Sequence, residues 1–164
     1  MLPDVLRDGL DVVFCGTASG TRSAALRRYY AGRGNRFWRI LFTVGLTPRQ
    51  LDPSEYELLL SYGIGLTDIV KSQSGADRGI HFDETGPQGL RRKVEQVSPR
   101  FLCFNGKRAA KEFSGRSKVE FGLQPETIGS TSLFVAPSTS GAAAASWDPA
   151  LWHELAGKVR GKAA

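Results

Sequence analysis

Two short polar loops that follow apolar segments are the first candidates for a binding site. In the loop FCGTASG, Gly16 and Gly20 stand just before a predicted helix. Glycine permits a sharp turn, which leaves amide N–H groups near a helix N-terminus free to bind an anion. The loop PSTSG offers three hydroxyls, from Ser138, Thr139 and Ser140. Each loop alone also fits an ordinary solvated turn, but together they would form a polar pocket for a phosphate or a planar heterocycle.

The segment YYAGRGNRFW places aromatic residues beside Arg33 and Arg36 in a glycine-bearing loop. This composition suits stacking on a base and contact with backbone phosphate. We expect Phe37 and Trp38 to be core residues instead, whereas Tyr30 is expected to face the pocket.

Predicted strands and helices alternate along the chain, and these elements must position the two loops. Apolar runs predict strands over 11–16, 101–104 and 132–136, a short buried stretch within 62–70, and a weaker strand or loop over 119–124. Helical spacing predicts helices over 23–30, over 35–44 with Asn35 as cap, over 54–61 and 88–97, and from 107 and 148. The pattern predicts one α/β domain over residues 1–164, three-layered (α/β/α) with a short, mainly parallel sheet. Ligands of such sheets bind beyond the carboxyl ends of the strands.

Composition narrows the function classes. The net charge of +6 favours a polyanionic partner, although weakly. Cys15 and Cys103 lie in apolar runs, which favours free thiols and a reducing, cytoplasmic setting. No stretch of about 18 apolar residues or signal peptide is recognised. His81 and His153 lack metal-site spacing, so we expect neither a metal nor a cofactor. The sequence has no phosphate-loop or dinucleotide fingerprint, which counts against a nucleotide-binding protein.

Six segments occur in an order that is similar to the mismatch-specific uracil-DNA and thymine-DNA glycosylases: FCGTASG, YYAGRGNRFW, GLTPRQL, YGIGLTDIV, FNGK and IGSTSLFVAPSTSG. The resemblance covers the chain roughly from Leu6 to Leu155. It implies a uracil-glycosylase fold, DNA with uracil or a mismatched pyrimidine as partner, and hydrolysis of the N-glycosidic bond of an extrahelical uracil without a cofactor. It implies no obligate protein partner, and we expect a monomer.

One position departs from the family pattern. The first motif of the family has an asparagine that positions the attacking water, and here that position is Ala18, whose methyl group can neither orient nor deprotonate water. A carboxylate from another loop could replace it. We favour Asp77 (SGADRG) over Asp68 (GLTDIV), although a surface charge or a cap is an alternative for each. The loop of Asp77 also holds the weaker candidates Asp83 and Glu84, which we rank below both.

The resemblance implies roles for the other site residues. Thr17 offers its backbone N–H to a uracil carbonyl, and Tyr30 takes the stacking position. The base-binding set is Gly16, Thr17, Ala18, Gly20, Ser23, Tyr30 and Asn35. The DNA-binding set is Lys107, Ser138, Thr139, Ser140, Gly141 and Ala142.

The family inserts a wedge after the position of Gly141, but here Ala142 and Ala143 have little bulk. We therefore expect a preference for single strands or mismatches. The function expected is a monofunctional uracil-DNA glycosylase of base-excision repair. The alternative is a weak or inactive module of the same fold that binds DNA or a lesion.

Overall fold

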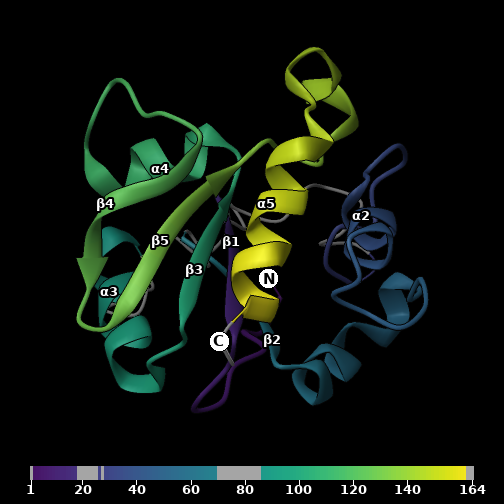
Figure 1. The fold of residues 1–164 in the computed structure, drawn as a ribbon, viewed down its shortest axis with the longest axis horizontal. Helices are drawn as coiled ribbons and strands as arrows, with labels where there is room; N and C mark the ends of the chain where they lie inside the picture. Colours follow the sequence, from purple (N-terminus) through teal and green to yellow (C-terminus); the bar gives the residue numbers. More distant parts are fainter. Residues whose placement is uncertain (1, 18–25, 27, 70–85, 162–164) are drawn as a thin grey trace.

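The computed structural model describes residues 2–17, 26, 28–69 and 86–161. Its centre is a five-stranded sheet in the order β2-β1-β3-β5-β4 (Figure 1). The strands β2, β1, β3 and β5 run parallel, and β4 pairs antiparallel with β5 at one edge. The strand bounds are β1 Val12–Gly16, β2 Ile64–Asp68, β3 Phe101–Asn105, β4 Gly122–Ile128 and β5 Thr131–Ala136. The predicted α/β fold with a mainly parallel sheet is confirmed.

Helices connect the strands and cover both faces of the sheet. The α-helices are α2 Phe37–Thr43, α3 Gly86–Val97, α4 Lys107–Ser114 and α5 Pro149–Arg160, and two 3₁₀ segments are η1 Pro53–Tyr62 and η3 Gly141–Ser146. Figure 1 shows α3 and α4 on the side of β4, and α2 on the opposite side of the molecule. None of the helices in the described ranges is both long and apolar enough to cross a bilayer.

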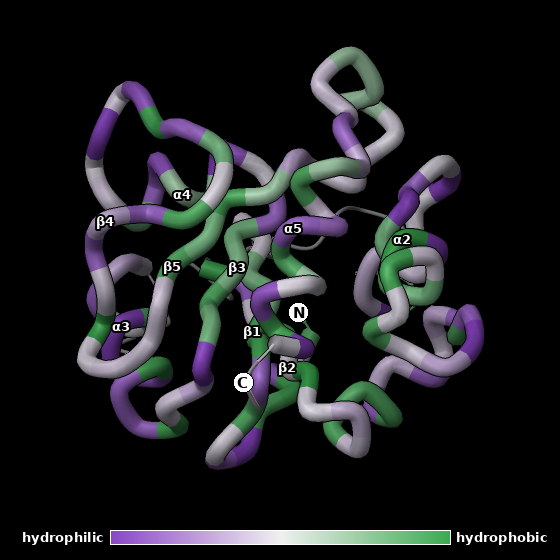
Figure 2. The backbone as a smooth tube through the Cα atoms, in the orientation of Figure 1, coloured by the Kyte–Doolittle hydropathy of each residue, from purple (hydrophilic) through white to green (hydrophobic). Residues whose placement is uncertain are grey.

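The alternation of side chains along the strands divides the core in two. Val12 and Phe14 of β1 belong to the cluster that α2, η1 and α5 cover, whereas Val13 and Cys15 belong to the cluster under α3 and α4. Both faces of a parallel sheet are normally buried, which explains why the strands read as continuous apolar runs. Figure 2 shows the hydrophobic residues concentrated on the central strands. This arrangement makes the three layers.

The structure corrects several predictions of local structure. The edge strand β4 spans Gly122–Ile128, later than the predicted 119–124. The predicted helix over 23–30 does not reach its end, because Tyr30 lies in a turn with φ +53°. Most of that predicted helix lies outside the described residues. The segment from Gly141 to Ser146, where no helix was predicted, forms η3.

The last predicted helix is confirmed together with its start. The Asp148 side chain accepts a hydrogen bond from the Ala150 N–H at 3.0 Å, and Pro149 occupies the first turn. Helix α2, predicted to span 35–44 with Asn35 as its cap, instead begins at Phe37 with Arg36 at the N-cap position, and Arg36 makes no side-chain capping bond. The Asn35 side chain accepts from the Phe37 N–H at 3.0 Å from one residue before that position. The Trp152 indole N–H of α5 donates to the Pro137 carbonyl at 3.0 Å. Helix α5 therefore holds the chain directly after β5 against the core.

Candidate active site

Four parallel strands end at one edge of the sheet, and polar groups gather there. Gly16 at the end of β1 pairs in register with Asp68 at the end of β2. Asn105 at the end of β3 pairs with Ala136 at the end of β5. Since the carboxyl ends of parallel strands are the usual ligand-binding edge of an α/β sheet, the loops that follow these residues define the candidate site.

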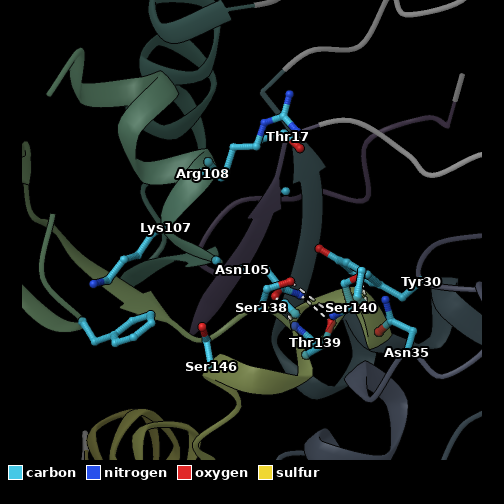
Figure 3. A pocket seen from close by; sticks show the side chains of 16 residues that line it. Thr17, Tyr30, Asn35, Asn105, Lys107, Arg108, Ser138, Thr139, Ser140 and Ser146 are labelled. Atoms are coloured by element: carbon cyan, nitrogen blue, oxygen red, sulfur yellow. Dashed lines mark hydrogen bonds between the residues drawn. The ribbon is translucent and has the colours of Figure 1, made fainter. Parts of the chain in front are cut away.

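A cavity of about 540 Å³ opens at this edge. Its wall is formed by the end of β1, the AGRGN loop, the turn between β3 and α4, the loop after β5 and η3 (Figure 3). The lining residues are Gly16, Thr17, Tyr30, Asn35, Asn105, Gly106, Lys107, Arg108, Ala109, Phe121, Ser138, Thr139, Ser140, Ala142, Ala143 and Ser146. Within this described lining there is no acidic side chain. The cavity is therefore suited to a neutral or anionic ligand.

Asn105 holds the loop after β5 in place. Its side-chain amide donates to the Thr139 hydroxyl at 3.0 Å and accepts from the Thr139 N–H at 3.0 Å. On the other side, the Thr139 carbonyl accepts from the Arg36 N–H at 2.8 Å. Thr139 is 1% exposed. Three of its polar groups are thus satisfied by β3 and by the start of α2, which gives the hydroxyl loop a defined position.

Two glycines let this loop approach its neighbours closely. Gly106 has φ +103°, and a Cβ added there would lie 3.1 Å from the Cβ of Ser138. A Cβ added at Gly141 would lie 3.3 Å from the Gly34 carbonyl oxygen. Both distances are shorter than an ordinary contact, so a side chain at either position would displace the loop. The glycines of FNGK and PSTSG are needed for close packing at the cavity wall.

Tyr30 stands between the AGRGN loop and the end of β1. Its ring stacks on Phe37 with a centroid distance of 4.1 Å and an interplanar angle of 29°. Its backbone lies in the left-handed region, which costs a residue other than glycine about 1–3 kcal/mol. Burial raises the pKa of Tyr30 well above its usual value, and the negative charge of Asp68 raises it further. The phenol is accordingly protonated at neutral pH.

Asp68 is buried, at 5% exposure, and does not line the cavity. A Cβ added at Gly16 would lie 3.1 Å from Asp68 Oδ1 and 3.5 Å from the Tyr30 hydroxyl oxygen. Gly16 therefore packs closely against both side chains, and a larger residue at this position would press on them.

Basic side chains lie on the side of the cavity opposite Tyr30 and Asn35 (Figure 3). Lys107 opens helix α4, and its ammonium group lies 4.4 Å from the centre of the Phe121 ring. Arg108 follows it and is exposed. A cation over an aromatic face is held in place without losing its charge. These two residues put positive charge at the rim, where a phosphate backbone would pass.

The structure brings together most of the predicted site residues. Predicted base-binding residues that line the cavity are Gly16, Thr17, Tyr30 and Asn35, and predicted DNA-binding residues that line it are Lys107, Ser138, Thr139, Ser140 and Ala142. Gly141, also in the predicted DNA-binding set, does not line the cavity. Predicted residues outside the described part of the chain are Ala18, Gly20, Ser23, Asp77, Asp83 and Glu84.

Seven lining residues were absent from the predicted site sets, namely Asn105, Gly106, Arg108, Ala109, Phe121, Ala143 and Ser146. Asn105 had a usable signal, because it is the first polar residue after the apolar run FLCF. A polar side chain at the carboxyl end of a buried strand is well placed to meet a ligand. Arg108 and Phe121 had no such signal, because their positions depend on how α4 and the chain before β4 pack around the cavity.

Comparisons with known proteins agree with this geometry. The chain resembles the solution NMR structure of a "putative Uracil DNA glycosylase" from Methanosarcina acetivorans with a TM-score of 0.65 and 24% sequence identity, and the match covers 97% of this chain and 96% of the other. This likeness concerns the fold. The family model described as "Uracil DNA glycosylase superfamily" matches residues 3–156. The chain therefore belongs to the uracil DNA glycosylase superfamily.

Proposed function

We propose that this protein is a monofunctional DNA glycosylase of base-excision repair that hydrolyses the N-glycosidic bond of an extrahelical uracil. The observation that carries the proposal is the cavity at the carboxyl edge of the sheet, which combines Thr17, Tyr30 and the Asn105–Thr139 pair with cations at its rim. A flipped pyrimidine needs such a pocket, with a stacking surface and polar groups at its edge. Membership of the superfamily supports the same reaction class.

In the proposed reaction, water attacks the anomeric carbon of the deoxyribose as the bond to the uracil ring nitrogen breaks. The bonding electron pair leaves with uracil, and the water gives its proton to a base. The Thr17 N–H, at the turn that follows β1, is proposed to meet a uracil carbonyl and to stabilise the negative charge that develops there. Preorganised donors of this kind usually supply the largest single part of the stabilisation. Because these donors are backbone N–H groups, they require no particular side chain in the loop.

We further propose that Asp77 receives the proton of the attacking water and replaces the asparagine absent at position 18. The described lining of the cavity contains no carboxylate, and Asp68 is buried and is not part of that lining. The absence of Asp68 from the cavity lining favours Asp77 over Asp68. General-base catalysis by a positioned carboxylate contributes about 10²- to 10⁴-fold.

The carboxylate proposal is tested by single-turnover excision with variants of both aspartates. Purified protein is mixed with a single-stranded oligonucleotide that contains one uracil, and abasic sites are cleaved with alkali and counted. Asp77→Asn should slow excision at least about 10²-fold, whereas Asp68→Asn should have a smaller effect. Full activity of both variants would show that no carboxylate of this pair is required.

The small residues of η3 support a preference for single-stranded or mismatched substrates. Ala142 is exposed at the cavity rim and Ala143 is half-buried there, so neither can fill the space left by a flipped base. A larger side chain would offset the few kcal/mol that unstacking costs. Excision from a U·A pair should therefore be slower than from a single strand, and equal rates would contradict this proposal.

A second candidate function is a module that binds DNA or a lesion without cleaving it. The absence of an acidic side chain from the described cavity wall, together with Ala18, favours this candidate. The same assay separates the two candidates, because a binding module would retain the oligonucleotide without producing alkali-labile sites.

A further inference from the structure

The hydroxyl of Tyr30 is a buried polar group that the fold itself does not use. Within the described part of the chain, it is buried and has no partner at ordinary hydrogen-bond geometry, although the Asn105 side chain is close enough to lower its pKa. Buried hydroxyls are normally paired, and an unpaired one is destabilising. The neighbouring Tyr29 shows the ordinary arrangement, because its hydroxyl donates to the Pro3 carbonyl at 2.9 Å. The Tyr30 hydroxyl is therefore available to a group that enters the cavity.

The direction of this hydroxyl is set by the packing around the ring. Phe37 stacks against one face, and the backbone of Tyr30 has the left-handed φ of +53°. Left-handed conformations of residues other than glycine are uncommon and concentrate at functional sites. Figure 3 shows Tyr30 beside Asn35 at the cavity wall, opposite Lys107 and Arg108. Because the ring is already fixed, its hydroxyl could bind a ligand without a further loss of side-chain conformational entropy.

The hydroxyl lies next to the turn that the proposed function uses. Its oxygen is 3.5 Å from the position that a Cβ of Gly16 would occupy, and Thr17 follows directly. A base carbonyl that approaches the Thr17 N–H would thus approach the Tyr30 hydroxyl as well. Two donors that converge on one oxygen are the arrangement that stabilises a developing negative charge.

We infer, on the basis of the proposed function, that the Tyr30 hydroxyl donates a hydrogen bond to the carbonyl oxygen of the flipped base that also faces the Thr17 N–H. Tyr30 then serves as a catalytic residue through its hydroxyl, in addition to any stacking by its ring. The bond strengthens as the base departs with the electron pair of the glycosidic bond, and no proton is transferred from the phenol.

The surroundings of the phenol agree with a donor that keeps its proton. Burial and the nearby charge of Asp68 raise the pKa of Tyr30, and the side chain of Asn105 opposes this shift in part. The Tyr30 phenol therefore keeps its proton at neutral pH.

The test compares Tyr30→Phe with wild type in single-turnover excision of uracil from a single strand. Removing one such donor should slow the chemical step about 10²-fold, while affinity for an oligonucleotide with a stable abasic-site analogue stays within about twofold. The melting temperature of Tyr30→Phe should not fall, because no hydrogen bond within the described structure is lost. Tyr29→Phe is the matched control: it removes a hydrogen bond to Pro3 and should lower the melting temperature without the loss of rate.

A second substrate distinguishes a donor from a ring that only stacks. 5-Fluorouracil is a more acidic leaving group than uracil, so its departure needs less stabilisation. The rate loss in Tyr30→Phe should therefore be smaller for 5-fluorouracil than for uracil. A variant that excises uracil within about twofold of wild type, or that loses the same factor on both bases, would overturn the inference.

The control reactions separate this inference from the proposed function. If the wild-type protein releases no base, both the proposed function and the proposed role of Tyr30 are wrong. If the wild-type protein is active and the Tyr30→Phe variant is equally active, only the proposed role of the hydroxyl is wrong.

Discussion

At the scale of single residues, Asn105 has the most clearly defined position in the site. Both ends of its amide bond to Thr139, which fixes the orientation of the amide and joins β3 to the loop after β5. Thr139 is almost fully buried, so its N–H and hydroxyl depend on this partner. Asn105 thus positions the hydroxyl loop and also presents its side chain to the cavity.

Replacing Asn105 should separate these two roles. Asn105→Ala leaves the N–H and the hydroxyl of Thr139 without their partner, and an unsatisfied buried group costs about 1–3 kcal/mol. Asn105→Asp can accept from both groups and should keep most of the stability. It also adds a negative charge beside a base that departs as an anion, and should therefore slow excision.

Thermal unfolding and single-turnover excision measure the two effects. The expected pattern is a lower melting temperature for Asn105→Ala, and a nearly unchanged one with slower excision for Asn105→Asp. A wild-type excision rate for Asn105→Asp would contradict a role of Asn105 in the site. An unchanged melting temperature for Asn105→Ala would contradict its role as the clamp of Thr139.

At the scale of elements, the turn between β3 and α4 depends on Gly106. Its φ of +103° and ψ of 154° form a conformation that other residues rarely adopt. Its N–H donates to the Ala136 carbonyl at 2.8 Å, so the turn is also fixed to the end of β5. The close approach to Ser138 follows from this fixed turn.

Gly106→Ala should affect stability and excision together. The backbone conformation costs a residue other than glycine roughly 1–3 kcal/mol, and the new methyl group would press on Ser138 and shift the hydroxyl loop. Gly122→Ala is a suitable control, because Gly122 has φ +98° and a Cβ there would meet no atom within 4 Å. Both variants should lower the melting temperature, but Gly106→Ala should also slow excision. Equal excision by the two variants would mean that the loop position does not matter.

The elements that were predicted from the sequence are those with a strong local signal. The runs VVFC and LFVA are continuously apolar because both faces of a parallel sheet are buried, and their strands were predicted almost to the residue. Strand β4, with the sequence GLQPETI, has polar residues, Pro125 and an irregular register between Leu123 and Thr127. Proline and bulges are tolerated at a sheet edge, so the strand exists without an apolar pattern that could reveal it.

The site could be predicted only in part, for a related reason. The loops at the carboxyl edge follow from the order of the strands, and this led to Gly16, Thr17 and Ser138–Ser140. The clamp between Asn105 and Thr139 spans 34 residues and depends on the packing of β3 beside β5. The left-handed backbone of Tyr30 has no sequence signal, because tyrosine rarely adopts it.

At the scale of the whole molecule, charge links the cavity to a nucleic-acid backbone. The chain has a net charge of +6, and Lys107 and Arg108 carry positive charge in the wall of the cavity. A protein that neutralises phosphates releases counterions, so its affinity falls as salt rises, with a slope set by the number of contacts.

Lys107→Ala should reduce the slope of log affinity against log salt by about one for a single-stranded oligonucleotide. Lys158→Ala, near the end of α5, is the matched control. The adjacent Val159 carbonyl accepts from Arg100 just before β3 begins, which places Lys158 toward the opposite edge of the sheet. Fluorescence anisotropy over a range of salt concentrations gives both slopes. Identical slopes for wild type and Lys107→Ala would exclude a phosphate contact of Lys107.

The proposed function requires the cavity at the carboxyl edge of the sheet to cleave uracil from DNA. The most direct measurement is to incubate an excess of wild-type protein with a single-stranded oligonucleotide containing one uracil, and to analyse both products by mass spectrometry. This function predicts that free uracil and an intact strand carrying one abasic site are formed in equal amounts. An unchanged oligonucleotide that is nevertheless bound by the protein would contradict it.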